Sequence, residues 1–370
     1  MGLPGLTFAA LKQTMKFHKF SFLFLLAFSL NGFAQTNDTL IFKGETHFKS
    51  IKQLTFGGDN AEAYFSPNGK YIVFQKTSPK EGIPCDQIYY GKLPKKKGDK
   101  FEPKLVSTGK GRTTCAYFMP DNKHILYAST HLADTACPPV PDRSVIKKYV
   151  WPLYDGFDIF ITDLNGKITK QLTNTPGYDA EATVSPKGDK IIFTSTRNGD
   201  IDLYLMDMDG GNVKQITFDL GYDGGAWFSP DGTKIVWRAS RPTTEEDVKE
   251  YKDLLAKGLV APTKMEVFTA NADGSDVKQI TSLGNANWAP NFDYTGKRII
   301  FASNHEYKRG FPFNLYMINL DGTGLTKLSR DGGFDAFPMF SPNGKKLIFS
   351  SNRNNGGTRD TNLFIVDWEE

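Results

Sequence analysis

The chain contains 370 residues, with 45 Lys and Arg residues against 41 Asp and Glu residues, and its formal net charge is +4. Three of the basic residues, Lys12, Lys16 and Lys19, fall in the N-terminal segment, where no acid occurs, so the rest of the chain is almost neutral. A near-neutral chain of mixed charge lacks the basic footprint of a nucleic-acid-binding protein, and no nucleic-acid partner is expected.

The N-terminal segment has the pattern of a secretory signal peptide. A basic stretch that begins at Met15 is followed by the apolar run Phe20–Leu30 and by small residues up to Ala34. These are the three parts of a signal peptide, and the apolar run is too short to span a bilayer. We therefore predict a signal peptide over residues 1–34, with Met15 as a second candidate start. The remaining chain is predicted to be exported to the periplasm or the extracellular space, without a transmembrane segment.

The stretch Gly177–Thr217 contains the unit from which the chain is built. Four short runs of aliphatic, aromatic and β-branched residues are each closed by turn residues such as Ser-Pro-Lys-Gly, a pattern that predicts four antiparallel strands. The turn motif occurs six times, at Phe65–Lys70, Phe118–Lys123, Val184–Asp189, Phe228–Thr233, Phe292–Lys297 and Phe340–Lys345. The shortest intervals between copies, about 44 and 48 residues, are typical of four-stranded propeller blades.

The two ends of the chain are predicted to close one ring of blades together. The segment His47–Thr55 ends in Lys-Gln-Leu-Thr, and similar endings form the fourth strands at Lys170–Thr173 and Lys214–Thr217. The C-terminal blade has only three predicted strands, so the N-terminal strand supplies its fourth. We therefore predict an all-β, six-bladed β-propeller with antiparallel blades over residues 47–370, preceded by a lead-in over residues 35–46.

Three insertions interrupt the repeat, and each lies between the second and third strands of a blade. They cover residues 76–87, 131–157 and 241–264. The third has an acidic start and places Val248, Tyr251 and Leu254 at helical spacing before Gly258, which predicts a short amphipathic helix over Glu245–Lys257. We expect the apolar stripe of this helix to pack on the propeller rim, and the helix to be a docking element for a partner.

The repeats resemble the WD40-like PD40 repeats of the TolB-like β-propellers. The resemblance rests on Ser-Pro-Asp-Gly, followed later by Leu-Tyr-x-Met and Asp-Gly, and it covers Ile51 to Trp368. TolB also carries an α/β domain ahead of its propeller, for which this sequence leaves no room. The resemblance implies a non-enzymatic scaffold or accessory subunit of the bacterial cell envelope, monomeric within a larger assembly. Its implied partner is an envelope lipoprotein or an outer-membrane complex.

One face of the predicted propeller carries the inter-blade links, the second-to-third-strand loops and therefore all three insertions. Variable loops gathered on one face often mark the binding side of a repeat protein. The site residues that we predict at the channel mouth on this face are Glu62, Arg112, Asp179, Glu181, Asp223, Arg241 and Asp335. Such a ring can bind a peptide, a chain end or a structural Ca²⁺, or its acids can make Asx turns and pair with the arginines.

The three cysteines are expected to approach the same face. Cys85 and Cys137 lie in insertions, and Cys115 begins an innermost strand. In an oxidising compartment two of them are expected to form a disulfide, and the candidate pairs are Cys115 with Cys85 and Cys115 with Cys137.

The sequence lacks the Gly-x-Ser-x-Gly, His-Glu-x-x-His and P-loop motifs. We therefore predict no catalytic residue and no cofactor, and interpret the chain as a non-enzyme. Some similar PD40-like propellers are lyases of pectin fragments that use a manganese ion held by histidines. The alternative hypothesis is thus a metal-dependent lyase or hydrolase, or a carbohydrate-binding propeller, that uses the same funnel. Its ligands would be Glu62, Glu181, His131 and His305.

Overall fold

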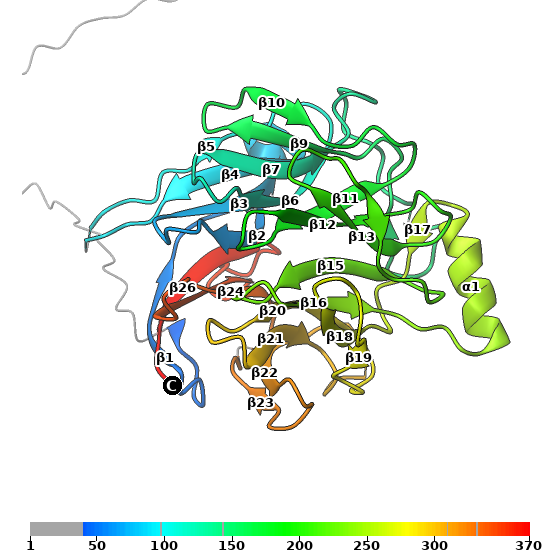
Figure 1. The fold of residues 1–370 in the computed structure, drawn as a ribbon. Coiled ribbons are helices and arrows are strands. Elements are labelled where there is room, and N and C mark those ends of the chain that lie inside the picture. The colour runs from blue at the N-terminus through cyan, green and yellow to red at the C-terminus, as the bar shows by residue number, and fades with distance from the viewer. Residues whose placement is uncertain (1–39, 97, 143, 309, 331) are drawn as a thin grey trace, which may run out of the picture. The chain divides into compact units, whose positions relative to one another are not determined.

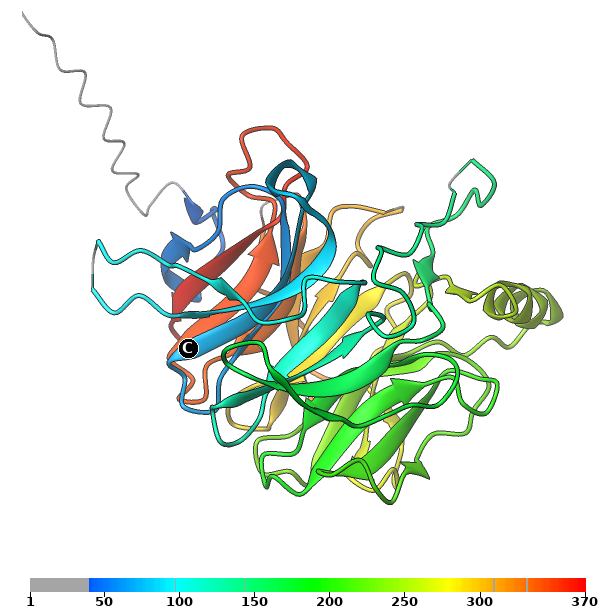
Figure 2. The same cartoon turned by 90° about the horizontal axis from the view of Figure 1, so that it is seen from above.

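The computed structural model describes residues 40–370 except 97, 143, 309 and 331, so the predicted signal peptide lies outside the described residues. Within the described part, six antiparallel sheets of four strands form the blades of a β-propeller (Figures 1 and 2). The innermost strands contact one another in the cyclic order β2, β6, β11, β15, β20, β24 and back to β2, which closes the ring. The predicted six-bladed all-β fold is confirmed.

The blades follow one another along the chain. Blade one contains β2 (Asp59–Phe65), β3 (Tyr71–Ser78), β4 (Ile83–Lys92) and β5 (Lys104–Leu105), and blade two contains β6 (Thr113–Phe118), β7 (His124–Ser129), β9 (Asp158–Asp163) and β10 (Ile168–Gln171). Blade three contains β11 (Asp179–Val184), β12 (Lys190–Ser195), β13 (Asp202–Asp207) and β14 (Lys214–Gln215), and blade four contains β15 (Asp223–Phe228), β16 (Lys234–Ala239), β18 (Glu266–Asn271) and β19 (Lys278–Gln279). Blade five contains β20 (Asn287–Phe292), β21 (Arg298–Ser303), β22 (Asn314–Asn319) and β23 (Thr326–Lys327), and blade six contains β24 (Asp335–Phe340), β25 (Lys346–Ser351), β26 (Asn362–Trp368) and β1 (Phe48–Gln53).

The repeated turn motif connects the first and second strands of each blade. In blade one, Ser66 Oγ accepts a hydrogen bond from the Tyr71 amide (3.0 Å), and the Gly69 amide donates to the Ser66 carbonyl (2.8 Å). Gly69 has a φ of 64°, a left-handed conformation that glycine adopts without a side-chain clash. In blade five Asp293 replaces the serine, and the Gly296 amide donates to its carbonyl (3.0 Å). Because the turn chemistry is local, the motif identifies every blade.

The N-terminal strand closes the last blade, as predicted. Strand β1 pairs antiparallel with β26, with Ile51 opposite Val366 and Gln53 opposite Phe364. Figure 1 shows β1, at the blue end of the chain, beside β26, at the red end. This pairing removes the free edge that the three-stranded blade would otherwise present.

The insertion of blade four contains the predicted helix, α1 (Glu245–Leu255), which ends two residues earlier than expected. Thr244 caps it by accepting a hydrogen bond from the Asp247 amide (3.1 Å). Tyr251 is buried and its hydroxyl bonds to Asp200 of blade three, so the helix packs on the rim. No helix among the described residues is both long and apolar enough to cross a membrane.

Two short strands that the sequence did not indicate join the insertions of blades two and four. They are β8 (Trp151–Pro152) and β17 (Leu259–Val260), which pair antiparallel. The insertion of blade one contains a short 3₁₀ helix, Pro79–Glu81. The insertions are thus structured parts of the fold.

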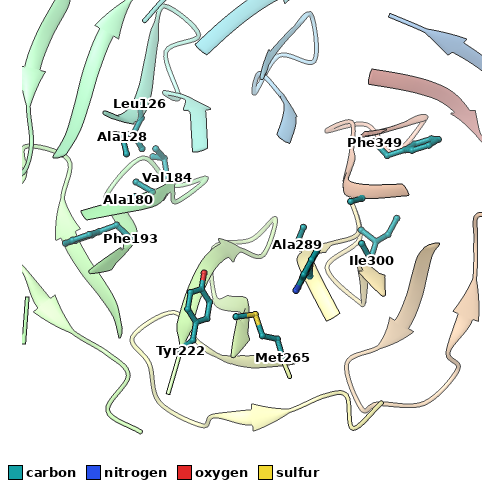
Figure 3. Packing of buried hydrophobic residues seen from close by; sticks show 14 of the residues in the cluster. Leu126, Ala128, Ala180, Val184, Phe193, Tyr222, Met265, Ala289, Ile300 and Phe349 are labelled. Atoms are coloured by element: carbon teal, nitrogen blue, oxygen red, sulfur yellow. The ribbon is translucent and has the colours of Figure 1, made fainter. Parts of the chain in front are cut away.

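The apolar core runs through the ring of blades. The largest cluster of buried apolar side chains includes Leu126, Ala180, Tyr222, Ala289 and Phe349, which come from five different blades or their links (Figure 3). Side chains near the central axis therefore have neighbours from several blades, and a group placed there is positioned by contacts between segments far apart in sequence.

Candidate functional site

A first ring of polar residues lies at the beginning of the innermost strands. We call Asn60, Thr113, Asp179, Asp223, Asn287 and Asp335 the strand-start ring. The exposed fraction of each is 1% or less. Two residues further along the same strands lies a second ring, which we call the bulge ring: Glu62, Cys115, Glu181, Gly225, Ala289 and Phe337. The two rings have different environments.

The buried aspartates of the strand-start ring form ion pairs with arginines from the second-to-third-strand loop of their own blade. Their carboxylates lie 3.0 Å (Asp179) and 2.8 Å (Asp223) from Arg197 and Arg241, and Asp335 lies 2.9 Å from Arg353, which also pairs with Glu45 (3.0 Å). In each blade the guanidinium lies over an aromatic ring at 5.0 Å. The structure thus places the predicted site residues Asp179, Asp223, Asp335 and Arg241 in pairs that hold a strand to its loop.

Two histidines take the place of this arginine in blades two and five. His131 bonds through Nδ1 to Ser129 Oγ (2.9 Å) and packs on Phe160, and His305 bonds to Ser303 Oγ (2.9 Å) and packs on Tyr316. Burial lowers the pKa of both imidazoles. Among the described residues, neither histidine belongs to the lining of the central cavity. The structure therefore does not bring them together with Glu62 and Glu181.

The bulge ring differs from the strand-start ring in its backbone. At each of its six positions the pairing with the second strand shifts, and φ is positive, between 45° and 64°. Residues with a β-carbon rarely adopt this conformation, because it costs about 1–2 kcal/mol. A bulge re-aims the side chain of its extra residue. All six residues line one small cavity at the centre of the ring, which we call the floor.

A buried ion pair organises the floor. Arg238 of β16 pairs with Glu181, and its Nη2 also donates to the Tyr222 hydroxyl (2.7 Å). Glu181 Oε2 accepts hydrogen bonds from Tyr222 (2.8 Å) and from Thr194 Oγ1 (2.9 Å). A β-carbon at Gly225 would clash with the Arg238 guanidinium. The glycine in the bulge ring therefore makes room for an arginine from the neighbouring strand.

The second carboxylate of the floor has a weaker environment. Glu62 is half-buried, and its hydrogen-bond partner is the thiol of Cys115. Burial raises the pKa of Glu62 to about 7, and the Glu181 carboxylate adds to this rise. Burial also raises the pKa of the Cys115 thiol well above its usual value, so the thiol stays protonated and is a weak donor.

Above the floor the cavity widens into a funnel of about 1260 Å³ on the face of the inter-blade links. Its aromatic lining consists of Tyr149, Trp151, Tyr154, Phe157, Tyr178, Tyr222, Trp288, Phe311, Phe313, Phe334 and Phe337. The predicted site residue Arg112 lies in this wall, paired with Asp86 (2.5 Å). Of the seven predicted site residues, Glu62, Arg112 and Glu181 therefore line the cavity.

One side of the funnel is built by the insertion of blade two, residues 131–157, which we call the strap. A disulfide joins Cys137 of the strap to Cys85 of blade one, and Cys115 is free. The prediction that Cys115 forms the disulfide is therefore wrong, because the bulge turns its side chain into the channel. At its other end the strap pairs through β8 with β17, and this places Trp151 5.0 Å over the Arg238 guanidinium.

Sequence reasoning missed Arg238 and the aromatic wall. One signal was present, since Arg238 stands at the fifth position of its strand, where four other blades have the small residues Ala128, Thr194, Ala302 and Ser350 and blade one has the neutral Gln75. A cation at a position that is uncharged in every other blade indicates a local role. The position of Trp151 had no such signal, because it depends on pairing between two insertions.

Comparison with known proteins agrees with this architecture. The family model described as "TolB beta propeller domain" matches residues 150–258. The solved structure of a putative TolB from Agrobacterium tumefaciens is 17% identical, covers 86% of this chain and 97% of that chain, and has a TM-score of 0.54. An oligogalacturonate lyase from Vibrio parahaemolyticus is 12% identical, covers 88% of this chain and 95% of that chain, and has a TM-score of 0.51. No curated protein matches the chain.

At these identities the two solved structures show the fold alone. The closed ring of four-stranded blades and the axial funnel define a six-bladed propeller with a cavity open on one face. The family model matches residues 150–258, so this part of the chain carries the sequence pattern of the TolB-like PD40 propellers that the repeats resemble. The resemblance seen in the sequence is thus confirmed.

Proposed function

We propose that this chain is an exported, non-enzymatic scaffold of the cell envelope that binds a partner protein through the funnel face. The observation that supports this proposal is the distribution of exposed apolar side chains. Most of the exposed large apolar side chains among the described residues lie in the inter-blade links and second-to-third-strand loops, and only Val213, Val277 and Leu325 lie in third-to-fourth-strand turns. Those of the links and loops are Phe56, Leu132, Val140, Val145, Tyr149, Phe218, Leu220 and Phe311. Exposed apolar residues gathered on one face are typical of protein-interaction sites.

The cavity on the same face is concave, so it suits a protruding segment of a partner better than a flat partner surface. Phe311 and Tyr149 are both exposed and line the funnel, so the apolar surface continues into it. Concave, aromatic-lined sites that receive a partner side chain are where binding energy concentrates. The TolB resemblance points to an envelope lipoprotein or an outer-membrane complex as this partner, in the periplasm or outside the cell.

The test is a pull-down from envelope extracts with the mature chain and two matched variants. Phe311→Asp places a charge on the funnel face, and Val277→Asp places one on another exposed apolar position, in a third-to-fourth-strand turn on the opposite face. We expect a stoichiometric partner that Phe311→Asp loses and Val277→Asp keeps. Equal capture by both variants would contradict the proposal.

Elemental analysis of the same preparation addresses the alternative. A tightly held transition metal in the absence of a protein partner would favour the metal-dependent enzyme, and substrate screening would follow. A captured partner whose binding depends on Phe311 would favour the scaffold.

A further inference from the structure

The floor of the funnel contains two carboxylates, Glu62 and Glu181, and one cation, Arg238. Glu181 is neutralised by Arg238 and accepts two further hydrogen bonds. Glu62 accepts a hydrogen bond from the Cys115 thiol, and among the described residues no ion pair involves Glu62. With Glu62 ionised, the floor carries one net negative charge.

The shape of the floor limits what can neutralise Glu62. The floor cavity has a volume of about 30 Å³, whereas a water-sized group needs roughly 10–15 Å³. A primary ammonium group is of this size, but a planar guanidinium with four heavy atoms is too large. The floor shares its lining with the funnel above, so an alkyl stem can reach it from the open face.

The bulge ring distributes its side chains in a way that suits a cation. The acids and the thiol come from blades one to three, whereas blades four to six contribute Gly225, Ala289 and Phe337. The Arg238 guanidinium takes the space beside Gly225, whereas Ala289 adds only a methyl group to the lining. The rings of Phe337, Tyr64 and Trp227 also line the floor, and aromatic faces attract cations.

We infer that the floor binds a primary ammonium group, the end of a lysine side chain that the partner segment inserts into the funnel, with Glu62 as its counter-ion. This inference rests on the proposed function and adds which kind of partner side chain the funnel recognises. The groups that face Glu62 are Cys115, Glu181, Arg238 and Asp86. Because the pKa of Glu62 is about 7 in the free protein, Glu62 is partly protonated near neutral pH. An ammonium group binds the ionised form, so binding releases the proton from the fraction of molecules that carry it.

The experiment uses three small probes with the mature chain: Nα-acetyl-lysine amide, Nα-acetyl-norleucine amide and Nα-acetyl-arginine amide. Binding is measured by ligand-observed NMR at pH 6, 7 and 8. We expect the lysine amide to bind at least about tenfold more tightly than either other probe. Its affinity should rise about tenfold from pH 6 to pH 8, as a carboxyl with a pKa near 7 ionises.

Two variants test the role of Glu62. Glu62→Gln should lower lysine amide affinity at least about tenfold and abolish its pH dependence, with unchanged circular dichroism. Glu102→Gln, at an exposed position outside the cavity, should behave like the wild type. Equal binding of the lysine and norleucine amides, or unchanged binding by Glu62→Gln, would overturn the inference.

The inference and the proposed function fail in different ways. Partner capture that survives Glu62→Gln, together with no preference for the lysine amide, would remove the inference and leave the scaffold proposal intact. Capture that is insensitive to Phe311→Asp would remove the scaffold proposal, and the amide titration would still decide whether the floor binds an ammonium group.

Discussion

The strand-start ring and the bulge ring lie on the same six strands, two residues apart, but their side chains have different roles. The aspartates Asp179, Asp223 and Asp335 are buried and paired with arginines of their own blades. Two residues further along, Glu62 and Glu181 line the central cavity. Acidic residues at similar positions of a repeat can thus belong to the scaffold or to the site.

The difference between the rings comes from the backbone. Every bulge-ring position has a positive φ and a shift in strand pairing, even where the residue is Phe337 or Ala289. A conformation that costs free energy at each non-glycine position and that all six blades retain indicates that the architecture needs it. Bulges next to sites are a common means of aiming side chains, and here the same device supplies six of the residues that line the cavity.

The largest expected effect tests the strand-start ring. Arg353→Ala removes a fully buried guanidinium and leaves Asp335 and Glu45 as buried carboxylates without their partner. We expect the free energy of unfolding to fall by about 3–5 kcal/mol, the usual cost of breaking a buried pair, in denaturant titrations. Arg359→Ala, at an exposed position of the funnel wall, is the control and should change stability by less than about 0.5 kcal/mol. A similar small loss for Arg353→Ala would mean that the strand-start ring is dispensable for folding.

The next effect compares two members of the bulge ring. Gly225→Ala adds a β-carbon at a φ of 64° that clashes with the Arg238 guanidinium, and should cost about 2–4 kcal/mol. Ala289→Gly is the reverse change at a φ of 49°. Its relief of backbone strain is offset by the flexibility of glycine in the unfolded chain, so stability should stay within about 1 kcal/mol of the wild type. Thermal unfolding of both variants checks this. A loss of only about 1 kcal/mol for Gly225→Ala would show that backbone strain alone, and not the clash with Arg238, decides the identity of residue 225.

The smallest effect concerns pH. The pKa of Glu62 rises from 4.5 to about 7 on folding because of burial, so the folded protein binds this proton more tightly than the unfolded chain does. The ionisation of Glu62 therefore lowers stability as the pH rises from 4.5 to 7, and the whole cost is present above pH 7. Glu62→Gln should be more stable than the wild type by about 1–3 kcal/mol at pH 8 and equally stable at pH 4. Denaturant titrations at both pH values test this, and Glu102→Gln is expected to follow the wild type. A stability difference between Glu62→Gln and the wild type that does not change with pH would show that the pKa of Glu62 does not rise on folding.

The sequence alone determined the number of blades, their order and the closure of the ring. Ser66, Gly69 and their equivalents make turns through hydrogen bonds between residues five apart or closer, so the motif carries its structure wherever it occurs. The same locality explains the prediction of α1, whose cap, Thr244, and apolar stripe are contiguous in sequence. Strand β1 was predictable because its ending matches that of other fourth strands.

Only the tertiary structure decided which polar residues line the cavity. Neither the burial of Asp179 nor the exposure of Glu62 to the funnel follows from the spacing of the repeats. In each innermost strand the pairing shifts just after the strand-start position, and this bulge changes the direction of the side chains that follow. Arg238 reaches Glu181 across 57 residues, and the disulfide joins Cys85 to Cys137 across 52 residues. Such contacts form because closure of the ring brings distant blades and insertions together. Side-chain direction and long-range pairing are therefore set by the packed ring and not by neighbouring residues along the chain.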